Sequence, residues 1–127
     1  MQCNEKGEIY VNGVKMGETT TSSDVLTSVI PRTTRLIAIK GYHGAGTSYI
    51  AASFTNTSFQ TTTQWKCSTQ DMVDSTDWAE VTFDDSDWGS ADKVGVMDSD
   101  ARFEQAEKIW KGSEEGAVYC RGWMGEY

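Results

Sequence analysis

The sequence predicts an all-β protein folded as an antiparallel β-sandwich or jelly roll, and three observations lead to that fold class. Val, Ile, Thr, Tyr, Phe and Trp recur in short runs between clusters of Gly, Asn, Asp and Ser. The chain contains one proline and no convincing helical stretch before residue 98. About seven or eight of the runs have strand length, which suffices for two packed sheets. With 127 residues, the chain is expected to form a single domain, residues 1–127, around one core.

The opening hairpin is the clearest element. Two strand-like runs, residues 8–11 and 14–17, flank the pair Asn12-Gly13. This pair supplies the positive φ angles that a two-residue hairpin turn requires. Residues 36–39, Leu-Ile-Ala-Ile, form an almost unbroken apolar run, which is typical of a central strand buried on both faces.

The later elements are defined by turns and short apolar runs. A glycine-rich turn at residues 41–48 leads to a returning strand at residues 49–54, which we expect to be an antiparallel neighbour of the central strand. Residues 98–110 contain apolar side chains at helical spacing, but we expect a single turn or a loop there at most. The remaining strands are expected at residues 61–68, 81–83, 94–97 and 117–123.

Charge and hydropathy exclude several classes of partner. The net charge is −8, from 19 acidic and 11 basic side chains with no basic cluster, so a phosphate backbone or an anionic lipid surface would be repelled. We therefore expect no nucleic-acid partner and, since no apolar run approaches roughly 20 residues, no membrane insertion. The first residues carry no hydrophobic signal core, so the chain is expected to be either cytosolic or the secreted form left after removal of a signal peptide.

The three cysteines favour the secreted alternative. They are far apart, with no C-x-x-C pair and no neighbouring histidine, which argues against a zinc site. Cys67 and Cys120 each lie inside a strand-like run, so we favour a disulfide between them. Cys3 would then be left over near a flexible end, where an interchain bridge is open to it. Three reduced cysteines packed as small hydrophobes are the alternative. Residues 56–58, Asn-Thr-Ser, form a glycosylation sequon that agrees with an extracellular location.

One stretch of the chain resembles a known family. Residues 77–91, DWAEVTFDDSDWGSA, resemble the W…FDDSxW…A signature of galactose-binding-like jelly-roll domains, which occur as accessory domains of glycoside hydrolases. Further segments resemble the same family in the same order over most of the chain: IYVNG at 9–13, LIAI at 36–39, the strand at 49–54, QWKC at 64–67, IW at 109–110 and VYCR at 118–121. The resemblance implies a galactose-binding-like β-sandwich.

The residues of this signature are interpreted as scaffold before ligand. Asp84, Asp85 and Ser86 can each bond nearby backbone groups and so fix a tight turn. Phe83 and Trp88 are expected to point into the core from either side of that turn. The same structural interpretation applies to Trp65, Trp78 and Trp110.

Two segments could supply a carbohydrate site. Sugar recognition needs an aromatic face and planar groups that make paired hydrogen bonds to adjacent hydroxyls. Tyr42 and His43 lie in the glycine-rich turn, where the backbone can approach a ligand closely. Arg121, Trp123 and Glu126 lie together near the C-terminus. The alternatives are a polar turn without a ligand and, for the C-terminal aromatics, a cover over a sandwich edge or an oligomer interface.

No motif indicates catalysis or a required cofactor. The chain has no G-x-S-x-G elbow and no phosphate-cradling loop, and its single histidine cannot form a multi-histidine metal site, so we do not expect an enzyme. The acidic loops at residues 71–77 and 98–100 could hold a structural calcium ion, although their spacing matches no specific calcium loop. Solvated acidic turns are the alternative.

The function expected from the resemblance is that of a carbohydrate-binding protein, a lectin, with galactose-containing glycans as the first ligand class. Because single sugar sites bind weakly, such a lectin would act multivalently as a homo-oligomer. The alternative is a non-catalytic structural or adhesive protein-interaction domain, which free monosaccharides would not displace from its partner.

Overall fold

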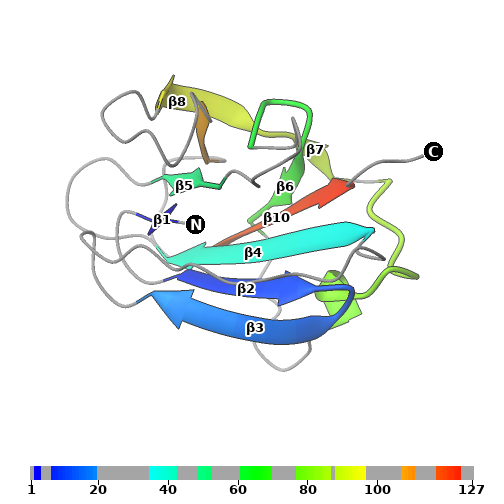
Figure 1. Ribbon diagram of the computed structural model, residues 1–127. Helices are drawn as coiled ribbons and strands as arrows, with labels where there is room; N and C mark the ends of the chain where they lie inside the picture. The colour runs from blue at the N-terminus through cyan, green and yellow to red at the C-terminus, as the bar shows by residue number, and fades with distance from the viewer. Residues whose placement is uncertain are drawn as a thin grey trace.

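The computed structural model describes residues 2–3, 7–19, 35–42, 49–52, 61–69, 77–86, 88–96, 107–110 and 117–123. Two antiparallel sheets make up the fold, and Figure 1 shows strands of the smaller sheet stacked above β4, β2 and β3 of the larger one. This arrangement confirms the predicted all-β antiparallel sandwich. The jelly-roll connectivity stays a prediction.

The larger sheet has six strands in the order β3-β2-β4-β10-β6-β7. Their bounds are β3 Val14–Thr19, β2 Gly7–Val11, β4 Leu36–Tyr42, β10 Ala117–Trp123, β6 Lys66–Ser68 and β7 Gly89–Ser90. The smaller sheet has four strands in the order β1-β5-β9-β8. Their bounds are β1 Gln2–Cys3, β5 Ile50–Ala51, β9 Glu107–Trp110 and β8 Asp92–Val96. One short 3-10 helix, η1, spans Asp77–Ala79.

Two predicted elements are confirmed closely. Asn12 and Gly13 have φ angles of 49° and 91°, as the two-residue turn between β2 and β3 requires. The predicted central strand is β4, which lies between β2 and β10. Its side chains Ile37 and Ile39 are fully buried, as expected for a strand covered by the second sheet.

The predicted neighbour of β4 is wrong, because β5 lies in the opposite sheet and pairs with β1 and β9. Gly41 provides the physical reason. A Cβ built on Gly41 would lie 2.8 Å from Ile50 Cγ1 and 2.9 Å from Trp110 Cζ3, so both side chains pack directly on the glycine backbone. The chain therefore crosses from one sheet to the other between β4 and β5.

Three further expectations need correction. Residues 81–83 form a turn and not a strand, and the Phe83 amide donates to the Glu80 carbonyl at 3.1 Å. Residues 107–110, the end of the helical candidate, form strand β9, because Ile109 pairs with β5 on one side and β8 on the other. The strand expected at 61–68 is limited to β6. Residues 98–106 lie outside the described residues.

The large sheet carries apolar side chains on both of its faces. Its inner face packs against the small sheet and contributes Ile9, Val11, Ile37, Ile39, Val118 and Cys120 to the main core cluster. Its outer face holds a second cluster, formed by Tyr10, Ala38 and Tyr119 with Trp78 and Ala79 from the η1 segment. Because side chains alternate along β4 and β10, each of these strands contributes residues to both apolar clusters.

The cysteines form one disulfide and one buried thiol. Cys67 and Cys120 face each other directly across β6 and β10, with their Cα atoms 4.1 Å apart, and the predicted disulfide joins them. Cys3 does not occupy a free end. Its side chain is 0% exposed, which leaves no surface from which its sulfur can reach a second chain. Burial raises the pKa of the Cys3 thiol to about 12.

We expect iodoacetamide at about pH 8 to leave every cysteine of the folded, oxidised protein unmodified. The reagent reacts with thiolates. Cys67 and Cys120 are joined in the disulfide, and Cys3 is a buried thiol with a raised pKa. Mass spectrometry should count no added groups in the folded protein, one after unfolding without reductant and three after unfolding with reductant. Rapid labelling of Cys3 in the folded protein would contradict its burial.

A second prediction concerns Gly122, where a Cβ would collide with the buried indole of Trp65. Gly122→Ala is expected to lower the free energy of unfolding by about 1–3 kcal/mol through overpacking. Gly95→Ala is the matched strand control, because its Cβ meets only Lys108 Cδ at 3.6 Å, and little change is expected. Urea unfolding measures the free energy of unfolding of both variants. If Gly122→Ala is as stable as Gly95→Ala, the Trp65 indole moves aside without cost.

Candidate functional site

The structure places the predicted ligand residues at two opposite ends of the large sheet. In the antiparallel ladder of β4 and β10, Tyr42 pairs with Ala117 and Leu36 pairs with Trp123. Figure 1 shows these two strands side by side along the length of the sheet. Six residue steps of ~3.3 Å separate the two ends by roughly 20 Å. Tyr42 and Trp123 therefore cannot line one monosaccharide site. His43 and Glu126 lie outside the described residues.

Arg121 is a buried structural residue, with a side chain that is 0% exposed. Its Nε donates to Asp85 Oδ2 at 3.0 Å, and its Nη1 donates to the carbonyls of Trp78 at 2.6 Å and Glu80 at 3.0 Å. Its Nη2 donates to the Phe83 carbonyl at 3.4 Å. Burial lowers the pKa of Arg121, and the Asp85 carboxylate opposes that shift. The guanidinium is thus directed at protein oxygens and holds residues 78–85 against the sheet.

The signature motif at residues 77–91 supplies all four oxygens that accept from Arg121. Asp84 Oδ1 accepts from the Ser86 amide at 3.0 Å, which closes the tight turn and lowers the pKa of Asp84. The Trp88 amide donates to the Asp85 carbonyl at 2.9 Å. Phe83 and Trp88 are partly buried against the outer cluster, with their ring centroids 5.6 Å apart in an edge contact. These contacts fit the scaffold interpretation of the motif.

Trp123 is the exposed aromatic residue of this region. Its side chain is 41% exposed, and its ring centroid lies 5.6 Å from Cζ of Arg121. The Phe83 ring lies 5.2 Å from the same guanidinium carbon. The buried cation therefore contacts an aromatic ring from the signature turn and an exposed indole, and cation–π attraction holds that indole in place.

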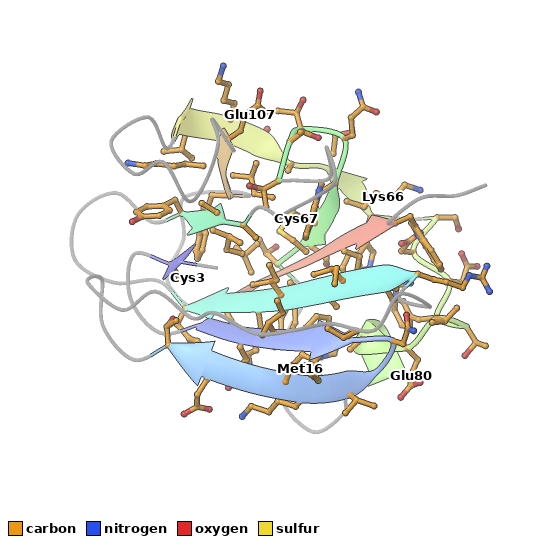
Figure 2. All side chains as sticks on the ribbon, viewed as in Figure 1. Cys3, Met16, Lys66, Cys67, Glu80 and Glu107 are labelled. Carbon is orange, nitrogen blue, oxygen red and sulfur yellow. A yellow bond between two sulfur atoms is a disulfide. The ribbon has the colours of Figure 1, made fainter. Side chains whose placement is uncertain are left out.

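Two exposed charged side chains lie at the same end of the sheet. Arg35 directly precedes Leu36, the strand partner of Trp123, and its amide donates to Asn12 Oδ1 at 2.9 Å. The Glu80 carboxylate covers the hairpin turn, since a Cβ on Gly13 would lie 2.6 Å from Glu80 Oε1. Figure 2 shows Glu80 at this end and Cys3 toward the opposite one. We call Trp123, Arg35 and Glu80 the Trp123 end.

Sequence analysis missed Arg35 and Glu80. Glu80 lies within the signature stretch at residues 77–91, whereas Arg35 lies in no motif; the pairing of Leu36 with Trp123 and the packing of residues 78–85 place both residues at one end of the sheet. The local signal for the buried role of Arg121 was also weak. Its flanking residues, Cys120 and Gly122, are both buried, but an arginine inside such a strand is informative only once its partners are known.

A second polar and aromatic group lies on the outer face nearer the Tyr42 end. Glu8 pairs with Lys40, and Lys40 pairs with Tyr119, so their side chains share one face. Glu8 accepts hydroxyl hydrogen bonds from Tyr10 and Tyr42, each at 3.0 Å. Lys40 Nζ lies 4.7 Å from the Tyr42 ring centroid and 5.2 Å from that of Tyr119. We call these five residues the Tyr42 cluster.

The pKa directions agree with this network. Burial raises the pKa of Tyr10, and its hydrogen bond to Glu8 adds to the shift. Burial by itself lowers the pKa of Lys40, but its interactions with Tyr42 and Tyr119 outweigh that effect and the net shift is upward. Lys40 is therefore an ammonium group at neutral pH.

The described residues contain no group of three or more His, Cys, Asp or Glu side chains placed to hold a metal ion. The acidic loops proposed for calcium fall outside those residues, apart from the backbone of Asp77. The part of the chain that the structure covers also has no helix with the length and hydropathy of a membrane span.

The contrast between Arg121 and Lys66 gives a prediction, because both cations contact Asp85 but only Arg121 is buried. Arg121→Met is expected to lower the free energy of unfolding by about 3–5 kcal/mol, since it leaves a carboxylate and three carbonyls without their donor. Lys66→Met, which removes an exposed partner at 3.6 Å, should cost about 0–1 kcal/mol. Urea titrations followed by circular dichroism compare them, and equal losses would refute the buried role of Arg121.

Comparison of the chain with protein-family models, with curated proteins and with solved structures gave no match. The likeness to galactose-binding-like domains thus rests on the sequence motifs.

Proposed function

We propose that this protein is a lectin that binds galactose-containing glycans at the Trp123 end. The observation that carries the proposal is the exposed indole of Trp123, held on a guanidinium that four protein oxygens fix in place. A pyranose packs its apolar face on such a ring, and a ring that is already ordered loses little conformational entropy on binding.

Two charged residues at the same end of the sheet, Arg35 and Glu80, are proposed to supply complementary hydrogen bonding. The Arg35 guanidinium is a donor only, whereas the Glu80 carboxylate is an acceptor only. Adjacent sugar hydroxyls both donate and accept, so one exposed group of each kind at the same end of the sheet as an exposed aromatic ring suits a glycan. The choice of galactose follows from the resemblance to galactose-binding-like domains.

The cellular setting that we propose is extracellular. The Cys67–Cys120 disulfide is compatible with an oxidising compartment, where such bonds persist. The excess of acidic side chains favours neutral glycans over polyanionic ones such as heparin-like polymers, because like charges repel. We propose binding without catalysis.

A non-catalytic structural or adhesive protein-interaction domain is the second candidate. Val14, which follows the hairpin turn at the Trp123 end, is 62% exposed and adds apolar surface to that end. An exposed valine and an exposed tryptophan at the same end of the sheet also suit a protein partner. Free galactose should displace a glycan ligand but not a protein ligand.

We expect Trp123→Ala to weaken binding of methyl galactoside about tenfold or more, because burying an aromatic ring contributes ~1.5–3 kcal/mol. Val94→Ala is the control, since Val94 is an exposed apolar residue on the other sheet at 40% exposure. A glycan array on the wild-type protein comes first, followed by NMR titration of both variants with methyl galactoside and methyl glucoside.

Two results would overturn the proposal. One is the absence of binding to any glycan by a folded wild-type protein. The other is galactoside binding that Trp123→Ala leaves unchanged, which would place the site elsewhere on the molecule. A partner protein that stays bound in excess free galactose would favour the interaction domain.

A further inference from the structure

We infer that Lys66 and Asp85 bind two adjacent hydroxyls of the sugar whose ring stacks on Trp123. This inference rests on the proposed lectin function and names the feature of the ligand that the site recognises, a vicinal diol. Arg35 and Glu80 share only an end of the sheet with the indole. Lys66 and Asp85 are connected to it through the contacts of a single residue, as follows.

Strand pairing places Lys66 on the same face of the large sheet as Trp123. Lys66 pairs directly with Arg121 in the ladder of β6 and β10, so both side chains point to the outer face. Trp123 lies two residues after Arg121, and the alternation of side chains returns it to that face. Figure 2 shows Lys66 near the end of β10 that carries Trp123. The two residues are diagonal neighbours on adjacent strands, a separation of about 7–8 Å that a long side chain can span.

Arg121 connects Asp85 to Trp123. Its Nε donates to Asp85 Oδ2 at 3.0 Å, and its Cζ lies 5.6 Å from the centroid of the Trp123 ring. Because the conjugated Cζ–Nε bond is about 1.3 Å long, the ring centroid and Asp85 Oδ2 lie within about 10 Å of each other. A single pyranose stacked on the indole can therefore extend its hydroxyls to the Asp85 carboxylate.

The ion pair of Lys66 with Asp85 offers a donor and an acceptor that a ligand can bridge. Lys66 Nζ lies 3.6 Å from Asp85 Oδ1, which is longer than a hydrogen bond. The two side chains are 44% and 13% exposed, so the pair reaches solvent. An ammonium group only donates and a carboxylate only accepts, whereas a hydroxyl does both. Of two adjacent hydroxyls, one can donate to Asp85 Oδ1 while the other accepts from Lys66.

Two other ion pairs of the described residues lack this combination. Lys15 Nζ lies 2.8 Å from Glu18 Oε1, so a direct hydrogen bond already joins the two groups. Lys93 Nζ lies 3.8 Å from Glu107 Oε2, but this pair belongs to the smaller sheet. The spacing of the Lys66 pair thus coincides with an exposed indole on the same sheet face.

The Asp85 carboxylate is already oriented before a ligand arrives. Its Oδ2 is held by Arg121, and its backbone carbonyl accepts from the Trp88 amide at 2.9 Å. A fixed group loses little conformational entropy when it binds. Replacing Asp85 would remove the carboxylate partner of a buried guanidinium, so Lys66 is the residue to change in an experiment.

The test compares methyl galactoside with its 2-, 3-, 4- and 6-deoxy analogues. Each is titrated into the wild-type protein, Lys66→Met and Lys93→Met, and NMR titration gives the Kd. Lys93→Met is the matched control, because it also removes an exposed lysine from an ion pair of similar length, but on the other sheet. Urea unfolding checks that both variants are folded.

We expect two analogues, those lacking adjacent hydroxyls, to bind the wild type roughly five- to tenfold more weakly, since each has lost one hydrogen bond. Lys66→Met should weaken binding of methyl galactoside by a similar factor. For this variant, loss of the lysine-bound hydroxyl should have no further effect, because its partner is already absent. Loss of the hydroxyl bound to Asp85 should still weaken binding. Lys93→Met should behave as the wild type.

The outcomes separate this inference from the function on which it rests. Binding of methyl galactoside that Trp123→Ala weakens and Lys66→Met leaves unchanged would overturn the inference and leave the lectin proposal standing. The same is true if Lys66→Met responds to every deoxy analogue as the wild type does. No binding of methyl galactoside by the folded wild type would overturn both. If a variant fails to fold, the wild-type series still decides, because losses at hydroxyls that are not adjacent would contradict a vicinal diol.

Discussion

The buried guanidinium of Arg121 is the interaction on which the rest of this structure depends. A charge inside a protein is tolerated only when it is paired and hydrogen-bonded. Here one carboxylate and three carbonyls from residues 78–85 provide those partners. Residues 78–85 therefore pack against the outer face of the large sheet, where Trp78 contacts Tyr10 and Tyr119.

The same constraint prepares the proposed ligand surface. Side chains alternate along β10, so Cys120 faces the inner core and forms the disulfide, while Arg121 faces outward beneath the signature turn. Trp123 follows on the outward face and contacts the guanidinium from the solvent side. Strand β10 thus carries one half of the disulfide, the buried cation of the ion pair and the exposed indole.

The outer face of the sheet combines an apolar patch with a polar network. Near the middle, Ala38 lies under the Trp78 indole; toward the Tyr42 end, Lys40 and Glu8 exchange contacts with tyrosine rings and hydroxyls. The outer face therefore has an apolar centre and a polar network nearer the Tyr42 end.

Local patterns in the sequence determined the all-β class, the Asn12-Gly13 hairpin, the buried strand β4 and the Cys67–Cys120 pairing, because turn chemistry and apolar runs act over a few residues. Only the tertiary structure decided that β5 crosses to the other sheet, that residues 107–110 form a strand, and that Arg121 is buried. It also decided that Tyr42 and Trp123 lie at opposite ends. These features depend on which distant segments pack together, and short-range periodicity carries no information about that choice.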